Sequence, residues 1–187
     1  PVARARRAFR LAALVSSRSA VSDARFSTVR TARAGAALHS TGEVSPGNDM
    51  KVHLVCGSLA LAPRLLELIE QTDGARVIEH TTVPLEALRA IAQSKPDVVV
   101  VEVQSPASPG LKVLRALRGQ PARPWLVVLA DDPSPEARDR YVSAGADYVF
   151  DRFHQLYGFG QTLETLALGT AAARRAAART RHAVATR

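Results

Sequence analysis

The run VVVVEV at residues 98–103 is the feature that most restricts how this chain can fold. Its apolar residues are continuous instead of alternating, which predicts a strand with both faces covered. A second run of this kind, PWLVVLA, occupies residues 124–130. Strands buried on both faces are typical of parallel sheets with helices on each side. We therefore expect an α/β protein.

Strand and helix patterns alternate around these two runs. Gly57 and Asp73-Gly74 supply stop and turn signals, and apolar residues then recur at helical spacing. Three further strands are predicted at 51–56, 75–80 and 147–150. Two helices are predicted at 61–71 and 84–94. A third follows Ser108-Pro109 and ends at Gly119, and a fourth follows Ser134-Pro135. A fifth helix is predicted to contain Leu163 and Leu166.

Five strands joined by helices predict a doubly wound parallel sheet, because right-handed crossovers place helices on both faces. We expect the flavodoxin-like order 2-1-3-4-5, with a functional crevice beyond the carboxyl ends of the strands. The residues expected at this edge are Cys56, Gly57, Glu102, Ala130, Asp131, Asp151 and Arg152.

The net charge of +8 is concentrated in the two ends of the chain. Residues 1–49 hold eight arginines against three acidic residues, and residues 166–187 hold five arginines and no acidic residue. The intervening part is slightly acidic, so the total charge does not indicate a nucleic-acid-binding domain. We expect a domain at 50–168 and an Ala/Arg-rich tail at 169–187 that is helical or disordered. The tail is expected to be solvated, and the alternative is that it makes weak contact with nucleic acid.

Residues 1–49 are expected to be largely disordered, because they lack periodic large apolar residues. The sole methionine, Met50, stands directly before the first predicted strand, which suggests a native start there. The other interpretation is an Arg- and Ser-rich transit peptide.

Several classes of protein can be set aside. The sequence contains no run of about 18 apolar residues, so no membrane span is predicted. The single cysteine, Cys56, excludes an internal disulfide framework and fits a reducing, cytoplasmic setting. Ser58 lacks the surroundings of a nucleophile elbow, and no phosphate-binding glycine motif is present. The histidines at 53, 80 and 154 lack metal-ligand spacing. Trp125 and Tyr148 are expected in the core or half-buried. We therefore expect this protein not to be an enzyme.

Several stretches taken in order resemble the receiver domain of bacterial response regulators. PDVVVVEV is similar to the third strand of that family, Pro106, Gly110 and LKVLRALR to the following loop and helix, PWLVVLA to the fourth strand and AGADYVFDRF to the fifth with its flanks. The resemblance spans roughly residues 51–168 and implies a CheY-like module of a two-component phosphorelay.

The resemblance also implies site positions, and five of them are substituted. Cys56 and Gly57 stand where the family has its magnesium-binding acidic pair, and Glu102 stands at the phospho-acceptor aspartate. Ala130 replaces the Thr or Ser switch residue, with Tyr148 as the aromatic switch equivalent, and Arg152 replaces the lysine. Magnesium sites are built mainly from carboxylates, and in-line transfer tolerates little misplacement. We therefore expect no magnesium binding and no phosphotransfer. The alternative is a receiver that is still phosphorylated, with Asp131 or Glu102 taking part.

Three alternatives stay open at this stage. Glu102 and Arg152 either form a fixed ion pair or face solvent separately. Asp131 and Asp132 either serve as solvated or capping loop residues or recruit a metal. Cys56 is either a small buried residue or a reactive thiol. By resemblance, a partner or second copy would contact the fourth helix, fifth strand and fifth helix, at Arg138, Tyr141, Tyr148 and 161–168.

Overall fold

The computed structural model describes residues 49–105, 107–120, 122–132 and 134–185, with side chains described as far as residue 174. The expectations for residues 1–48 and for Pro106 lie outside the described residues. The proposed division into an extension, a domain and a tail remains a prediction.

The core of the structure is a five-stranded parallel sheet with the order β2-β1-β3-β4-β5. This confirms the predicted flavodoxin-like topology. The strands are β1 Met50–Val55, β2 Ala75–Thr81, β3 Val98–Val103, β4 Trp125–Ala130 and β5 Tyr148–Asp151.

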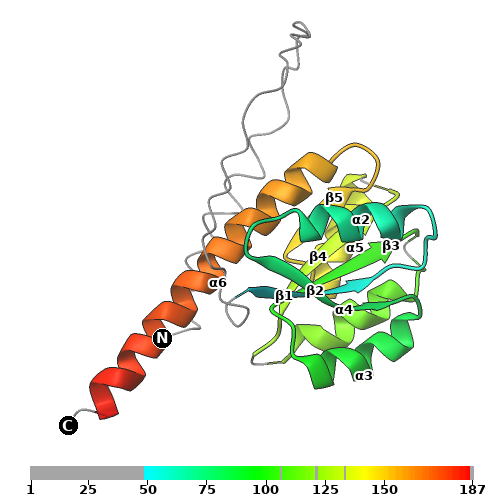
Figure 1. Cartoon of the computed structure of the whole chain (residues 1–187). Helices are drawn as coiled ribbons and strands as arrows, with labels where there is room; N and C mark the ends of the chain where they lie inside the picture. Colours follow the sequence, from blue (N-terminus) through cyan, green and yellow to red (C-terminus); the bar gives the residue numbers. More distant parts are fainter. Residues whose placement is uncertain (1–48, 106, 121, 133, 186–187) are drawn as a thin grey trace, which may run out of the picture. The chain divides into compact units, whose positions relative to one another are not determined.

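Helices cover both faces of the sheet, as the crossover rule requires. Figure 1 shows α2 and α3 on opposite sides of it, with α4 beside α3. The helix α6 packs beside α2. A Cβ atom added at Gly160 of α6 would lie 3.7 Å from Leu68 Cδ2 of α2. The helices are α2 Leu61–Glu70, α3 Pro84–Ser94, α4 Gly110–Arg118, α5 Pro135–Ala144 and α6 Leu156–Ala185.

The two central strands explain the apolar runs of the sequence. Every residue of β3 and β4 is buried. On one side, alternate valines of β3 pack in a cluster with Ile91 of α3, Leu114 of α4 and Tyr141 of α5. Tyr141 is fully buried, so the expectation that it contacts a partner is wrong.

The two Ser-Pro signals have different outcomes. Ser134 caps α5, because its hydroxyl accepts a hydrogen bond from Ala137 N–H. Ser108 is not the N-cap of α4, because Pro109 takes that place and the helix begins at Gly110. A Cβ at Gly110 would lie 2.9 Å from the carbonyl oxygen of Glu102. This close approach of α4 to β3 requires glycine.

The helix α6 is anchored at the amino-terminal edge of the sheet by Arg174. Its guanidinium donates to the carbonyl of Asp49 and to Asp97 Oδ2, each at 2.7 Å. Asp97 Oδ2 also accepts from Lys51 N–H at 2.8 Å. Arg174 therefore attaches the start of the Ala/Arg-rich segment to the edge of the sheet. The apolar pattern of the sequence did not indicate this contact.

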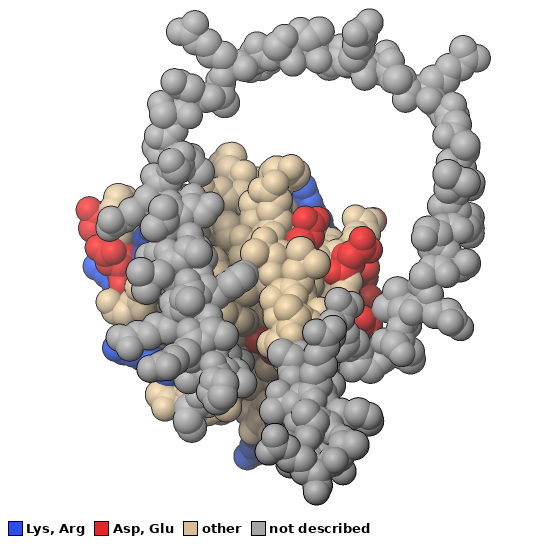
Figure 2. Space-filling model, turned by 90° about the vertical axis from the view of Figure 1, so that its left-hand side faces the viewer, with Lys and Arg blue, Asp and Glu red and all other residues tan. Residues whose placement is uncertain are grey.

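Charge is dispersed over the face of the described residues seen in Figure 2. Both basic and acidic side chains are visible among the described residues on this face. Within the described part of the chain, no helix is both long enough and apolar enough to span a bilayer.

A buried histidine connects β1 to the edge strand β2. His53 is fully buried, and its Nε2 lies 3.1 Å from Thr81 Oγ1. Its Nδ1 has no hydrogen-bond partner among the described residues and lies 3.8 Å from Glu79 Oε2. Burial lowers the pKa of His53, although the Glu79 carboxylate opposes this shift. The ring is therefore neutral in the folded protein near pH 7.

This histidine predicts acid sensitivity. Below the ordinary pKa of 6.5, the unfolded chain binds a proton that folded His53 resists, so the free energy of unfolding falls with falling pH. We expect His53→Gln to flatten this slope between about pH 7 and pH 5, by at most about 1.4 kcal/mol per pH unit. Urea unfolding at several pH values measures it. Equal slopes in the wild type and His53→Gln would contradict the assignment.

Candidate functional site at the carboxyl edge of the sheet

The carboxylate of Glu102 is the centre of the crevice. It stands one residue before the end of β3, and its side chain is only 3% exposed. Oε2 accepts hydrogen bonds from Gly57 N–H and Ser58 N–H, both at 3.1 Å, and from Cys56 Sγ–H at 3.2 Å. All three donors come from the end of β1 and the loop that follows it.

Arg152 holds the other oxygen of this carboxylate. Its Nη1 donates to Glu102 Oε1 at 2.5 Å, and the Arg152 side chain is 16% exposed. Gln104 Nε2 also approaches Oε1, at 3.5 Å. The fixed ion pair, one of the two alternatives left by the sequence, is therefore what the structure contains. Because both partners are mostly buried, the pair is weakly screened by water.

Asp131 extends the pair into a three-residue network. Its Oδ1 lies 2.6 Å from Arg152 Nε, as an ion pair without hydrogen-bond geometry. Burial raises the pKa of Asp131, while Arg152 acts in the opposite direction. The expectation of a solvated or capping residue is wrong for Asp131. It holds for Asp132, whose Oδ1 accepts from Ser134 N–H at 2.9 Å and whose pKa this contact lowers.

Asp151 fixes the backbone next to Arg152. Its carboxylate accepts hydrogen bonds from Phe153 N–H at 2.7 Å and from His154 N–H at 3.2 Å. In return, Gln155 Oε1 accepts from Asp151 N–H at 2.9 Å. Burial alone would raise the pKa of Asp151, but the hydrogen bonds from Phe153 N–H, from the His154 ring and from His154 N–H lower it. The reciprocal contacts resemble a capping box before α6, and they orient Arg152 toward the crevice.

Cys56 is a buried hydrogen-bond donor. Burial, together with its hydrogen bond to Glu102, raises the pKa of the thiol to about 12. The thiol therefore stays protonated near neutral pH, and the interpretation as a small buried residue holds.

Of the two switch-equivalent positions, Ala130 has no polar side-chain group to offer the crevice. Ala130 is fully buried at the end of β4. Tyr148 is half-buried at the start of β5, and its ring centroid lies 6.0 Å from that of Trp125 and 6.5 Å from that of Phe150. Both aromatic residues at 125 and 148 thus belong to the packing of the sheet, as expected.

The resemblance raises the question of a magnesium ion at this edge, and the residues present do not fit one. Cys56, Gly57 and Ser58 turn hydrogen-bond donors toward the Glu102 carboxylate, whereas magnesium needs oxygen ligands. Among the described residues, no group of three or more His, Cys, Asp or Glu side chains is arranged to hold a metal.

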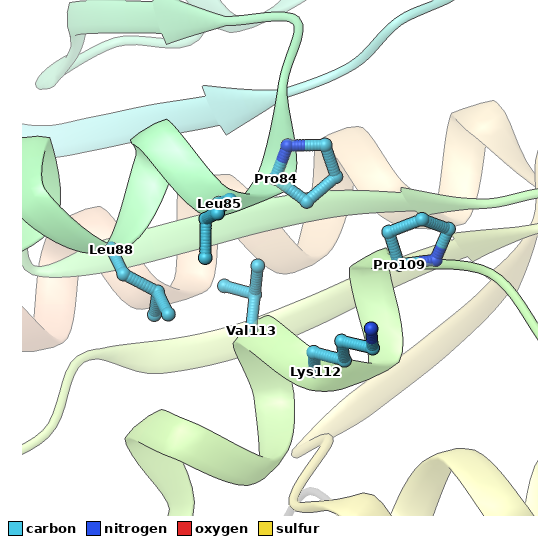
Figure 3. Close-up of a pocket in the computed structure, with 6 residues that line it drawn as sticks. All are labelled: Pro84, Leu85, Leu88, Pro109, Lys112 and Val113. Atoms are coloured by element: carbon cyan, nitrogen blue, oxygen red, sulfur yellow. The ribbon is translucent and has the colours of Figure 1, made fainter.

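A separate shallow pocket lies between α3 and α4. Pro84, Leu85 and Leu88 line one side, and Pro109, Lys112 and Val113 line the other. Figure 3 shows Leu85 and Val113 facing each other across it. It shares no residue with the Glu102 network and presents one charged side chain, so it offers little for chemistry.

The sequence had placed Glu102, Cys56, Gly57, Ala130 and Arg152 at one edge of the sheet, and the structure brings them together there. It did not indicate the ion pair of Asp131 or the amide of Ser58. A carboxylate directly after a buried strand was the available signal for Asp131. No sequence signal marks a backbone N–H as a ligand of Glu102.

The buried ion pair predicts a large effect of removing its cation. Arg152→Met would leave the carboxylates of Glu102 and Asp131 without their guanidinium, which we expect to lower the free energy of unfolding by roughly 2–4 kcal/mol. Urea unfolding at unchanged m-value measures this. The matched control is Arg89→Met at an exposed position of α3, with an expected change below about 0.5 kcal/mol. Equal costs of the two substitutions would argue against the network.

The protonated thiol predicts slow chemistry at Cys56. At pH 8 a thiol with a pKa of about 12 is almost entirely protonated, so a disulfide reagent such as Ellman's reagent should modify the folded protein very slowly. In denaturant the same thiol should react fully. Rapid modification of the folded protein would show that Cys56 is accessible and ionised.

Comparisons of the sequence with curated proteins match part of the chain. An 81-residue stretch is 35% identical to a protein-glutamate methylesterase/protein-glutamine glutaminase of Hahella chejuensis, covering 43% of this chain and 23% of that protein. A similar protein of Myxococcus xanthus is 33% identical over 78 residues, covering 41% and 22%. The matched stretch thus spans less than a quarter of either relative. No protein-family model matches the chain.

Solved structures match about two thirds of the chain. The receiver domain of a signal transduction histidine kinase from Syntrophus aciditrophicus has a TM-score of 0.55 and 25% identity, covering 64% of this chain and 90% of that one. The response regulator domain of Thermotoga maritima CheB has a TM-score of 0.55 and 16% identity, covering 65% and 96%. The strand order, the crossover helices and these likenesses agree: the chain has the fold of response-regulator receiver domains.

Proposed function

We propose that this chain is a receiver-like module of two-component signalling that acts through protein contacts without being phosphorylated. One observation carries the proposal: the carboxylate at the phospho-acceptor-equivalent position, Glu102, is already bound on both oxygens. A carboxylate must present a free oxygen to attack a phosphoryl group. Both oxygens of Glu102 are instead engaged in a site that is largely closed to solvent.

The substituted positions support the same proposal. The positions equivalent to the acidic pair offer a protonated thiol and one backbone amide, and Ala130 has no hydroxyl. Phosphoryl transfer needs a metal ion and donors to neutralise charge on the transferred group. In the proposed function, the crevice keeps one conformation, which the ion pair of Glu102 and Arg152 maintains.

The proposed contact surface is the face of α5, β5 and α6, where a protein partner or a second copy would bind. Arg138 lies there, with its guanidinium donating to the carbonyl of Val149 at 3.0 Å. Tyr148 is half-buried on the same face. Within 161–168, the exposed side chains are Gln161, Glu164, Thr165 and Leu168. Tyr141 is excluded because it is buried.

The activities named for the curated relatives are not part of the proposal. The matched stretch covers less than a quarter of those two proteins, and the receiver fold supports a signalling role without an enzymatic one. Cytoplasmic placement remains a prediction from the sequence. Phosphorylation with Asp131 or Glu102 taking part, and weak nucleic-acid contact through the basic ends, remain the alternatives.

Treatment with acetyl phosphate and magnesium, followed by intact-mass measurement, tests the proposal. We expect no phosphoryl adduct on the wild type, because no described side chain offers both a free carboxylate and a metal site. The positive control is a variant with the family residues restored, carrying Cys56→Asp, Gly57→Asp, Glu102→Asp, Ala130→Thr and Arg152→Lys. A phosphoryl adduct on the wild type that maps to Glu102 or Asp131 would overturn the proposal.

A further inference from the structure

The donors around Glu102 form a site of opposite polarity to the one that the resemblance implies. Where an acidic pair would hold a divalent cation, this chain directs Gly57 N–H, Ser58 N–H and the Cys56 thiol at a negative charge. Gly57 has no side chain, so its contribution is the amide alone. Consecutive backbone N–H groups that converge on one atom favour an anion.

A fixed cation completes this set of donors. Arg152 Nη1 reaches the second oxygen of the carboxylate at 2.5 Å, so each oxygen of the bound group has its own donors. Asp131 pairs with Nε of the same guanidinium at 2.6 Å, and the guanidinium carbon lies 4.6 Å from the centroid of the Phe153 ring. Arg152 therefore has contacts that hold it in place independently of Glu102.

The occupant and its donors come from separate parts of the chain. Glu102 is carried by β3, the amides by the loop after β1, and the guanidinium by the residue after β5. The donors recognise only the two oxygens of a buried carboxylate, and nothing in that recognition requires the carboxylate to be covalently attached to the chain.

We propose that the ends of β1 and β5 form an oxyanion-binding site for a carboxylate-sized ligand, and that Glu102 fills it as a built-in ligand. This goes beyond the proposed function, because it follows from the contacts alone and makes no statement about phosphorylation. It identifies the ligand class of the crevice as a small monocarboxylate. Truncating Glu102 should leave a site that formate or acetate can enter.

The test is chemical rescue of Glu102→Ala, followed by thermal unfolding and by amide NMR. The variant should melt below the wild type in sodium chloride. Sodium formate at equal ionic strength should raise its melting temperature in a saturable manner, by roughly 4 °C at about ten times the dissociation constant. The same titration should shift the amide resonances of Gly57 and Ser58 with a matching dissociation constant.

Three controls make the result specific. Glu102→Gln fills the space without charge, so formate should stabilise it no more than chloride does. The wild type should also be insensitive, because its own carboxylate occupies the site. In the double variant Glu102→Ala with Arg152→Met, the rescue should be lost.

Two outcomes would overturn the inference. One is equal stabilisation of Glu102→Ala by formate and by chloride, with no shift at Gly57 or Ser58. The other is a formate effect that survives removal of Arg152. If Glu102→Ala is unfolded in chloride, formate should restore its folded circular dichroism spectrum and should not restore that of the double variant; failure to do so counts equally against the site. Phosphorylation of the wild type would contradict the proposed function while leaving this result unaffected.

Discussion

One buried carboxylate connects three parts of the chain that are distant in sequence. Glu102 joins the loop after β1, through two backbone amides, to the residue after β5, through the guanidinium of Arg152. A buried charge is costly unless it is paired and hydrogen-bonded, and here both oxygens are satisfied. The arrangement of the crevice therefore depends on this side chain, and neighbouring contacts at Asp131 and Asp151 support it.

The same interaction relates the fold to its proposed role. A parallel sheet of this topology brings the ends of its strands together into one crevice, whatever residues stand there. In this chain those residues include Glu102, its donors, Ala130 and Asp131, which pairs with Arg152. The donors around Glu102 leave no oxygen cage for a divalent cation there. In the proposed function, a crevice closed in this way presents a constant surface to protein partners.

Much of the fold could be predicted from the sequence because its cause is local. The apolar runs of β3 and β4 require cover on both faces, and the Ser134-Pro135 cap is a contact within one helical turn. The strand ends then identified Glu102 and Arg152 as neighbours. Features that depend on long-range packing were not predictable: the pairing of Asp131 with Arg152, the full burial of Tyr141 and the anchoring of α6 through Arg174. The amides of Gly57 and Ser58 were missed because every residue except proline carries such a group.

The most direct test of this account is a double-mutant cycle between Glu102 and Arg152, with Glu102→Gln and Arg152→Met measured singly and together by urea unfolding. The account predicts a coupling energy of at least about 1.5 kcal/mol, because Arg152→Met leaves the buried Glu102 carboxylate without its cation only while that carboxylate is present. A coupling energy below about 0.5 kcal/mol would mean that the two residues contribute independently, and it would contradict the claim that their ion pair holds the crevice in one conformation.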